Sequence, residues 1–195
     1  MPSRARSLDP RSVRVQAKLK EAALALVRER RIESISVLEI AERASASRQV
    51  FYLHFADRDD VVASAMIDMI RAAVFDGEVD DPSSRVHRLV DISIGCEPIA
   101  RNLRPSAASE RLADFFHELL VEICRPLARA RGEHSGSSAI EDEAAEVLAA
   151  FLAGGLREVI KFASNCAERP GGGLPAEAAH RMVDRCLELV RGREG

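Results

Sequence analysis

The chain lacks the cysteine pattern that marks disulfide-rich domains and zinc sites. Its four cysteines, Cys96, Cys124, Cys166 and Cys186, stand far apart, and no two form a C-x-x-C pair. A chain of 195 residues that builds its own core does not need disulfides, so we interpret these thiols as small buried hydrophobes. The five histidines are equally scattered, whereas a zinc site needs ligands at characteristic spacing. We therefore expect no metal and no cofactor.

The chain also lacks any long apolar run. Its longest apolar stretch is far too short to span a membrane. The polar start over residues 1–11 contains Pro and Arg and does not have the form of a secretory signal. With 47% hydrophobic and 30% charged residues, the composition is typical of a soluble globular protein of one large or two small domains. We expect a cytoplasmic protein that makes no membrane contact.

Motifs that would indicate an enzyme are missing as well. The sequence contains no G-x-S-x-G, no P-loop and no G-x-G-x-x-G. The glycines at 171–173 follow a predicted helix and not a strand, which makes them a poor phosphate-binding loop. Catalysis needs a nucleophile, an acid–base pair, a metal or a cofactor in convergent positions. The chain is therefore predicted not to be an enzyme.

Charge is divided unevenly along the chain, although the net charge is only −3. Residues 1–58 contain twelve basic and seven acidic side chains, a net of +5, and the remainder therefore carries −8. A basic N-terminal module on an acidic body indicates that only the first part meets a polyanion.

Helical periodicity dominates what is present. Apolar residues recur at three- and four-residue steps, and no segment reads convincingly as a strand. Asp57 and Asp81 are expected helix N-caps, and Pro126 should kink its helix or end it early. The sequence predicts an all-α fold of about nine helices. We expect an N-terminal domain over residues 1–57 and a larger helical domain over residues 58–195.

The segment at 36–55 has the pattern of a helix-turn-helix. Ser36, followed by Glu39, forms a capping box that begins a short helix ending near Ala44. Ser47 can cap a second helix through Phe55. Two short helices joined by a tight turn can place the second in the DNA major groove. A helical hairpin with an ordinary polar face fits the periodicity equally well. The helix-turn-helix reading predicts an outer face made by Arg48, Gln49, Tyr52 and His54, with Phe51 and Phe55 beneath it.

Several short motifs in this region occur together in one known family. They are Ser36, the helix Ile40-Ala41-Glu42-Arg43-Ala44, Ser47, the stretch Tyr52-Leu53-His54-Phe55, and the start Asp57-Arg58-Asp59-Asp60-Val61. In this set, residues 15–62 resemble the N-terminal domain of the TetR family of bacterial regulators. The resemblance implies a dimer that binds double-stranded operator DNA, most often as a repressor.

The resemblance also implies individual roles. Ser36, Tyr52, His54 and Arg58 would hold phosphates, and Ser47 and Arg48 would stand at the start of the recognition helix. Gln49 and Val50 would face base edges. The arm over residues 1–14, with four arginines, either reaches the DNA or is a disordered tail.

The sequence departs from the family pattern at the turns. Arg31 stands where a glycine usually separates the first two helices, and Ser45 and Ala46 replace the usual Gly-Val of the turn. Because glycine eases a positive φ angle, Ser45 should cause modest strain or alter the turn. Gln49 replaces a small residue and should shift the base preference.

The resemblance extends to the body of the chain as two expectations. The middle helices would form a pocket for a small, largely apolar effector, with candidate contacts at Met66, Met69, Ile92, Cys96, Phe115, Phe116, Leu119 and Phe151. The last two helices would form a four-helix dimer interface, with candidate residues Gly154, Gly155, Glu158, Phe162, Met182 and Cys186. For both sets, an ordinary place in the monomer core is the alternative. A helical protein-interaction module without sequence-specific DNA binding is the alternative for the whole chain.

Overall fold

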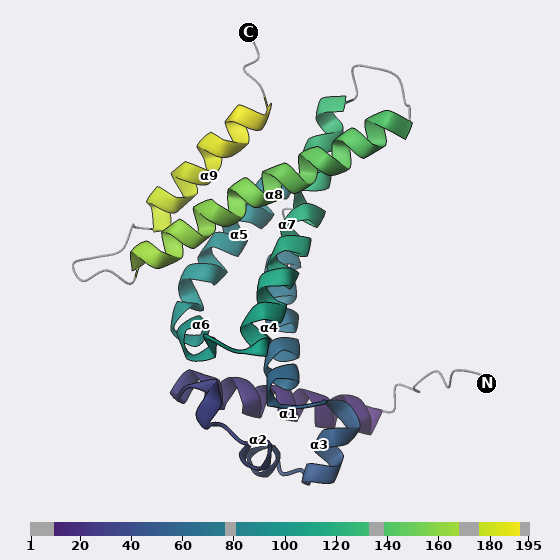
Figure 1. Ribbon diagram of the computed structural model, residues 1–195, viewed down its shortest axis with the longest axis vertical. Coiled ribbons are helices and arrows are strands. Elements are labelled where there is room, and N and C mark those ends of the chain that lie inside the picture. Colours follow the sequence, from purple (N-terminus) through teal and green to yellow (C-terminus); the bar gives the residue numbers. More distant parts are fainter. Residues whose placement is uncertain (1–9, 77–80, 133–138, 168–175, 192–195) are drawn as a thin grey trace. The chain divides into compact units, whose positions relative to one another are not determined.

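The computed structural model describes residues 10–76, 81–132, 139–167 and 176–191, and this part of the chain is all-α, as predicted (Figure 1). The predicted arm up to residue 9 and the glycines at 171–173 lie outside the described residues. The described elements include the nine expected α-helices and one short 3-10 helix that was not predicted. In chain order they are α1 (Pro10–Glu29), η1 (Ile32–Ser34), α2 (Val37–Arg43), α3 (Arg48–His54), α4 (Arg58–Phe75), α5 (Pro82–Gly95), α6 (Glu97–Leu103), α7 (Ala107–Gly132), α8 (Ala139–Ala167) and α9 (Ala176–Arg191).

The chain divides into two packed units. The first contains Met1–Asp68 and Pro98–Arg111, and the second contains Met69–Glu97 and Leu112–Gly195. This division differs from the expected boundary between residues 57 and 58. Periodicity identifies the apolar face of a helix but not the partner on which it packs, so the sequence could not assign the start of α4 or residues 98–111. Helices α4 and α7 each contribute residues to both units.

The core of the first unit is built on one face of α1. Its fully buried side chains recur at helical spacing, and α1 contacts α2, which in turn contacts α3. Ile40 of α2 and Phe51 of α3 are 0% exposed. Burying a side chain of this size contributes about 1.5–3 kcal/mol. The buried α1 residues are Leu19, Ala22, Ala23, Leu26 and Val27.

Residues 98–111 belong to the first unit because polar contacts fasten them to it. The Nδ2 atom of Asn102 donates to the Val27 carbonyl at 2.8 Å, and the Arg31 guanidinium donates to the Arg104 carbonyl at 2.8 Å. At the start of α7, the Ala108 N–H donates to Oδ1 of Asp59 at 3.1 Å. A side chain of α4 therefore caps the first turn of α7.

The second unit is built around α5, α8 and α9, which contact one another pairwise (Figure 1). Each of the three helices turns a row of small or branched apolar residues inward. In this part of the chain, Pro126 stands inside α7, and the helix continues to Gly132. The expectation that Pro126 could end the helix early is therefore wrong, because a helix tolerates the missing N–H where the proline is exposed to water, as it is here. None of the described helices has the length and apolarity needed to cross a membrane.

A cross-paired cluster of two His and two Asp joins α5 to α9. Nε2 of His87 lies 2.8 Å from Oδ1 of Asp184, and Nε2 of His180 lies 2.8 Å from Oδ1 of Asp91. The two imidazole rings meet edge to face, with 4.7 Å between their centroids. On each helix the His precedes its own Asp by four residues, so both side chains point from the same face. The two bonds fix how α9 lies on α5.

The cysteines resolve into two kinds. Cys124 is buried in α7, and burial raises the pKa of its thiol to about 11, so it stays protonated and unreactive. Cys96 and Cys186 are only half-buried. The interpretation as buried hydrophobes therefore fits Cys124 and not these two. The side chain of Cys166 lies outside the described residues.

The His–Asp cluster should contribute measurable coupling. We expect a double-mutant cycle with His180→Ala and Asp91→Ala to give an interaction of about 1 kcal/mol in urea unfolding, because each substitution removes one partner of a hydrogen bond. Arg185→Ala, an exposed neighbour on α9, is the control and should add independently to Asp91→Ala. Strict additivity of the His180 and Asp91 substitutions would show that the contact contributes nothing.

Candidate nucleic-acid interface

Helix α2 begins with the predicted capping box. The Glu39 N–H donates to Oγ of Ser36 at 3.2 Å, and the Ser36 N–H donates to Oε2 of Glu39 at 2.9 Å. The hydrogen bond from the Ser36 backbone lowers the pKa of the Glu39 carboxyl, and contacts with Arg30 and the Ser36 hydroxyl lower it further. Ser36 is exposed, so its hydroxyl lies at the surface beside the positive end of α2.

The turn between α2 and α3 is a complete Schellman motif built without glycine. The Ala46 N–H donates to the Ala41 carbonyl at 2.8 Å, and the Ser45 N–H donates to the Glu42 carbonyl at 3.0 Å. Ser45 has φ 54°, the left-handed conformation that glycine normally supplies. The expected strain is therefore present, and the turn keeps its regular form. Arg31, the other departure, has φ −62° and ψ 140°, so no glycine is needed there.

Helix α3 presents one exposed face and one buried face. Ser47 caps it by accepting the Val50 N–H at 3.2 Å. Phe51 is 0% exposed beneath the helix, whereas Tyr52 and Leu53 are 50% and 59% exposed. The Arg48 guanidinium lies over the Tyr52 ring, 5.9 Å from its centroid. Arg48, Gln49, Tyr52 and Leu53 make the exposed face, while Val50 is half-buried.

His54 is less exposed than the other residues of the predicted outer face, and its contact with a phosphate stays a prediction. This side chain is half-buried, and its Nδ1 lies 3.2 Å from Nε2 of Gln16 on α1. His54 follows the buried Phe51 by three residues, which turns it toward α1 and leaves the outer position to Leu53. Sequence reasoning missed Gln16 and Leu53. Counting one helical turn of four residues from Gln49 would have found Leu53, but no local signal identifies Gln16.

Arg58 also has a role that the sequence did not reveal. Its Nη1 donates to the carbonyls of Glu33 at 3.0 Å and Ile35 at 3.1 Å, and its Nε pairs with Asp59 at 3.2 Å. Arg58 thus ties the start of α4 to the segment before α2. Arg58 and Ser36 line the same open hollow of about 450 Å³, together with carboxylates including Asp57. Whether either residue contacts a phosphate stays a prediction.

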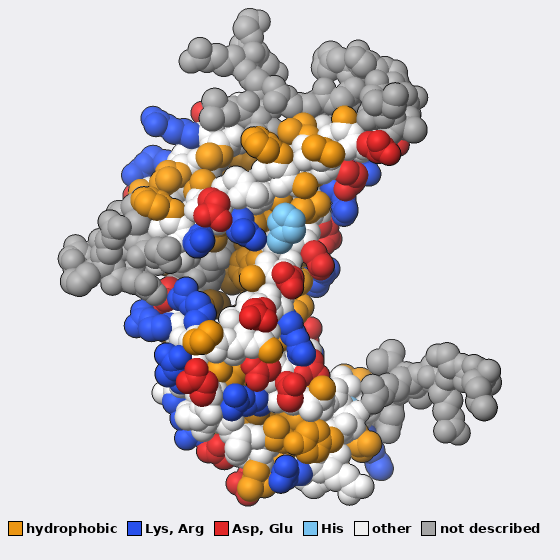
Figure 2. All heavy atoms as spheres, in the orientation of Figure 1, with side chains coloured by type: hydrophobic (Ala, Val, Ile, Leu, Met, Phe, Trp, Pro, Cys, Tyr) orange, Lys and Arg blue, Asp and Glu red, His pale blue; other side chains and the backbone are white. Residues whose placement is uncertain are grey.

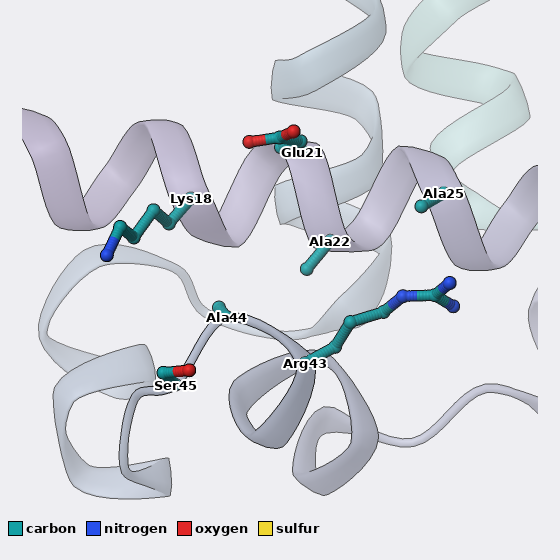
Figure 3. Close-up of a pocket in the computed structure, with 7 residues that line it drawn as sticks. All are labelled: Lys18, Glu21, Ala22, Ala25, Arg43, Ala44 and Ser45. Carbon is teal, nitrogen blue, oxygen red and sulfur yellow. The ribbon is translucent and has the colours of Figure 1, made fainter.

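A groove of about 360 Å³ runs between α1 and the end of α2 (Figure 3). Figure 3 shows Lys18 and Arg43 reaching away from each other along it, with Ala22 and Ala44 at its floor and Ser45 beside Lys18. Arg43 donates to Glu29 at 2.7 Å. This bond lowers the pKa of the Glu29 carboxyl and raises that of Arg43.

The predicted effector contacts belong to both units. Met66 is buried in the first unit, and the other seven belong to the second. Phe115 and Leu119 are buried in α7, whereas Met69, Ile92, Cys96 and Phe116 are half-buried. Phe151 is 76% exposed, because it lies on the face of α8 opposite the buried Leu152 and Leu156. That these residues contact an effector stays a prediction. Within the described part of the chain, no group of three or more His, Cys, Asp or Glu could hold a metal ion.

The predicted dimer residues of α8 share an outward stripe. A methyl group added at Gly154 or Gly155 would meet nothing within 4 Å, and Phe162 is 48% exposed. Glu158 is exposed on the same stripe. Figure 2 shows hydrophobic side chains at the surface over α8. Met182 and Cys186 of α9 are half-buried.

The helix-turn-helix region matches a known protein family and one curated relative. Residues 19–65 match the family described as bacterial regulatory proteins, tetR family. Over 64 residues, the chain is 39% identical to the uncharacterized HTH-type transcriptional regulator YxbF of Bacillus subtilis (strain 168). The aligned stretch covers 31% of this chain and only 17% of that protein, far less than two thirds of its length.

Solved structures resemble nearly the whole chain. The dihydroxyacetone kinase operon activator DhaS has a TM-score of 0.58 at 15% identity, covering 90% of this chain and 93% of its own. NalD, the secondary repressor of the MexAB-OprM multidrug efflux pump in Pseudomonas aeruginosa, has 0.53 at 16% identity, covering 94% and 100%. The fatty acid degradation regulator FadR from Bacillus halodurans has 0.52 at 15% identity, covering 92% and 95%. At these identities the likeness is one of fold.

The capped pair α2–α3 on α1, with a polar and aromatic outer face on α3, defines a helix-turn-helix DNA-binding protein, a class of regulators and not of enzymes. Its residues 19–65 form a domain of the tetR family of bacterial regulatory proteins.

The strain at Ser45 generates a prediction. Ser45→Gly should raise the free energy of unfolding by about 1 kcal/mol or less, because a side chain in the left-handed region costs about that much. Ala46→Gly is the matched control and should lower stability, since Ala46 has no positive φ to relieve. Thermal unfolding of both variants would test this, and equal shifts would show that Ser45 is not strained.

Proposed function

We propose that this regulator binds a palindromic DNA operator as a homodimer and represses transcription until a small, largely apolar ligand releases it. The observation that carries the DNA contact is the exposed face of α3, where Arg48, Gln49 and Tyr52 lie together above the buried Phe51. The capped starts of α2 and α3 supply backbone N–H groups and positive helix ends that favour phosphate.

Each side chain of this face suits a distinct part of duplex DNA. Arg48 can donate two hydrogen bonds to guanine, and Gln49 can pair with adenine. The half-buried Val50 suits the methyl group of thymine. The Tyr52 hydroxyl and the Ser36 hydroxyl are placed to reach phosphates, which fix position without reading sequence. Gln49 therefore sets this operator apart from those of relatives with a small residue there.

Dimerisation is supported by the outer stripe of α8. Val147 and Phe151 are 71% and 76% exposed, and they line a shallow apolar hollow of about 520 Å³. The stripe continues through Gly154 and Gly155 to Phe162, opposite the buried face of the helix. Small residues between exposed apolar ones allow two helices to approach closely in a two-fold contact. One recognition helix reads a single half-site, which has too few base pairs for specificity. A dimer supplies a second recognition helix for the other half-site.

Release by an effector is supported by the apolar character of the second unit. Met69, Ile92, Cys96 and Phe116 are uncharged and only half-buried, so they could turn toward a ligand. Such a ligand acts only if it binds the conformation that releases DNA more tightly than the one that holds it. Whether the protein represses or activates can be measured with a DNA template that carries the operator. Transcription from this template should fall when the protein is added and recover when the ligand is added.

Substitutions on α3 should weaken operator binding without unfolding the protein. Arg48→Ala should lower affinity about tenfold to a hundredfold, the cost of one bidentate base contact. Tyr52→Phe should lower it by a smaller factor of about 5, since it removes one hydroxyl and keeps the ring. Gel shifts with an operator selected from random duplexes measure both effects.

Two controls accompany these variants. Melting temperatures close to that of the parent chain would show that folding is intact, because both side chains are exposed. Binding should weaken steeply with salt, as phosphate contacts require. Unchanged affinity in both variants, or a flat salt response, would refute the assignment of α3.

The dimer can be tested with two variants that each introduce one negative charge, the first on the stripe of α8 and the second outside it. Phe151→Glu should shift the protein from dimer to monomer in sedimentation at micromolar concentration, because a carboxylate would be buried at the interface. Ala72→Glu introduces the same charge at an exposed position of α4, outside the stripe, and should remain dimeric. A parent chain that sediments as a monomer would refute the interface.

A further inference from the structure

Cationic side chains lie on two different flanks of α1. On one flank, Nζ of Lys20 forms an ion pair with Asp68 of α4 at 2.5 Å. On the other flank, Arg14 and Lys18 follow each other at four-residue spacing, and both are exposed. Among the residues that the structure describes, neither Arg14 nor Lys18 has a charged partner, which leaves this flank positive.

Nearby carboxylates do not neutralise this flank. Glu21 lies one turn beyond Lys18 and lines the same groove, but no ion pair joins these two side chains (Figure 3). Glu29 is bound to Arg43 at 2.7 Å. Lys18 therefore stands at the groove as an unneutralised cation beside Ser45.

This part of α1 is held against both ends of the recognition helix. Lys18 lines the groove with Ser45, which precedes the start of α3 by three residues. On the opposite flank, which also carries Lys20, Gln16 lies 3.2 Å from His54, the last residue of α3. The basic flank therefore adjoins the turn that leads into α3 and rests on a 20-residue helix, so its position follows that of the recognition helix.

We propose that Arg14 and Lys18 form a second phosphate-binding strip, which contacts the backbone of duplex DNA beside the base pairs that α3 reads. This assignment rests on the proposed operator binding and extends it. Its occupant is DNA because the strip adjoins the reading face and its unneutralised cations complement the charge of the phosphodiester backbone. The strip adds affinity and register but no base preference, since phosphates are alike in every sequence.

The test compares salt dependence with sequence preference. In Arg14→Gln/Lys18→Gln, the slope of log K against log salt should fall by about 2 per bound subunit, one for each lost phosphate contact. Affinity should fall by the same factor for the selected operator and for a duplex of mixed sequence. Lys18→Gln alone should lower the slope by about 1, and Lys18→Arg should restore it.

Lys20→Gln is the matched control, two residues away on the opposite flank and paired with Asp68, and its slope should equal that of the parent. An unchanged slope in the double variant, while Arg48→Ala still abolishes operator preference, would overturn the strip and leave the proposed function standing. Loss of preference in the double variant would also overturn it. A parent chain that prefers no sequence would refute the proposed function itself.

Discussion

The side chains proposed to contact DNA stand mainly on two helices of only seven residues each, and helices this short do not persist alone in water. Everything at the interface therefore depends on how α2 and α3 are held. Side-chain caps at Ser36 and Ser47 satisfy orphan N–H groups at their starts, and Ile40 and Phe51 bury their inner faces. The left-handed turn at Ser45 then fixes the angle between them. Helix α1 is the support that makes this local chemistry rigid.

The start of α4 extends that support toward the rest of the chain. Arg58 binds two backbone carbonyls ahead of α2, and Asp59 accepts the Ala108 N–H at the start of α7. These contacts assign the first turns of α4 and α7 to the DNA-binding unit, while both helices continue into the second unit. The chain crosses between the two units within α4, α6 and α7, and these are the covalent paths along which a change in the second unit can reach α3. A change in α4 or α7 would act on side chains that already brace the exposed face of α3.

Structural features that depend on residues within one turn of helix could be predicted from the sequence. Features that depend on packing between residues far apart in the sequence could not. The caps at Ser36, Ser47 and Asp81, the buried Phe51 and the left-handed Ser45 all follow from neighbours in the chain. The contact between His54 and Gln16 could not be predicted, because the two residues are 38 positions apart. The exposure of Phe151 could not be predicted either, because an apolar residue in a helix has the same local pattern in a core and at the surface. The two-unit division at residue 68 depends on contacts that no local pattern encodes.

The crossed His–Asp pairs can form in only one register of α9 on α5. Because the order His then Asp repeats on both antiparallel helices, each His meets an Asp only when Asp184 is level with His87 and Asp91 is level with His180. A slide of α9 by one helical turn, about 5.4 Å, would place His180 opposite His87 in one direction and Asp184 opposite Asp91 in the other, and either slide would break both hydrogen bonds. A displacement of α9 along α5 therefore breaks both hydrogen bonds together, and the two pairs favour a single position of α9 on α5.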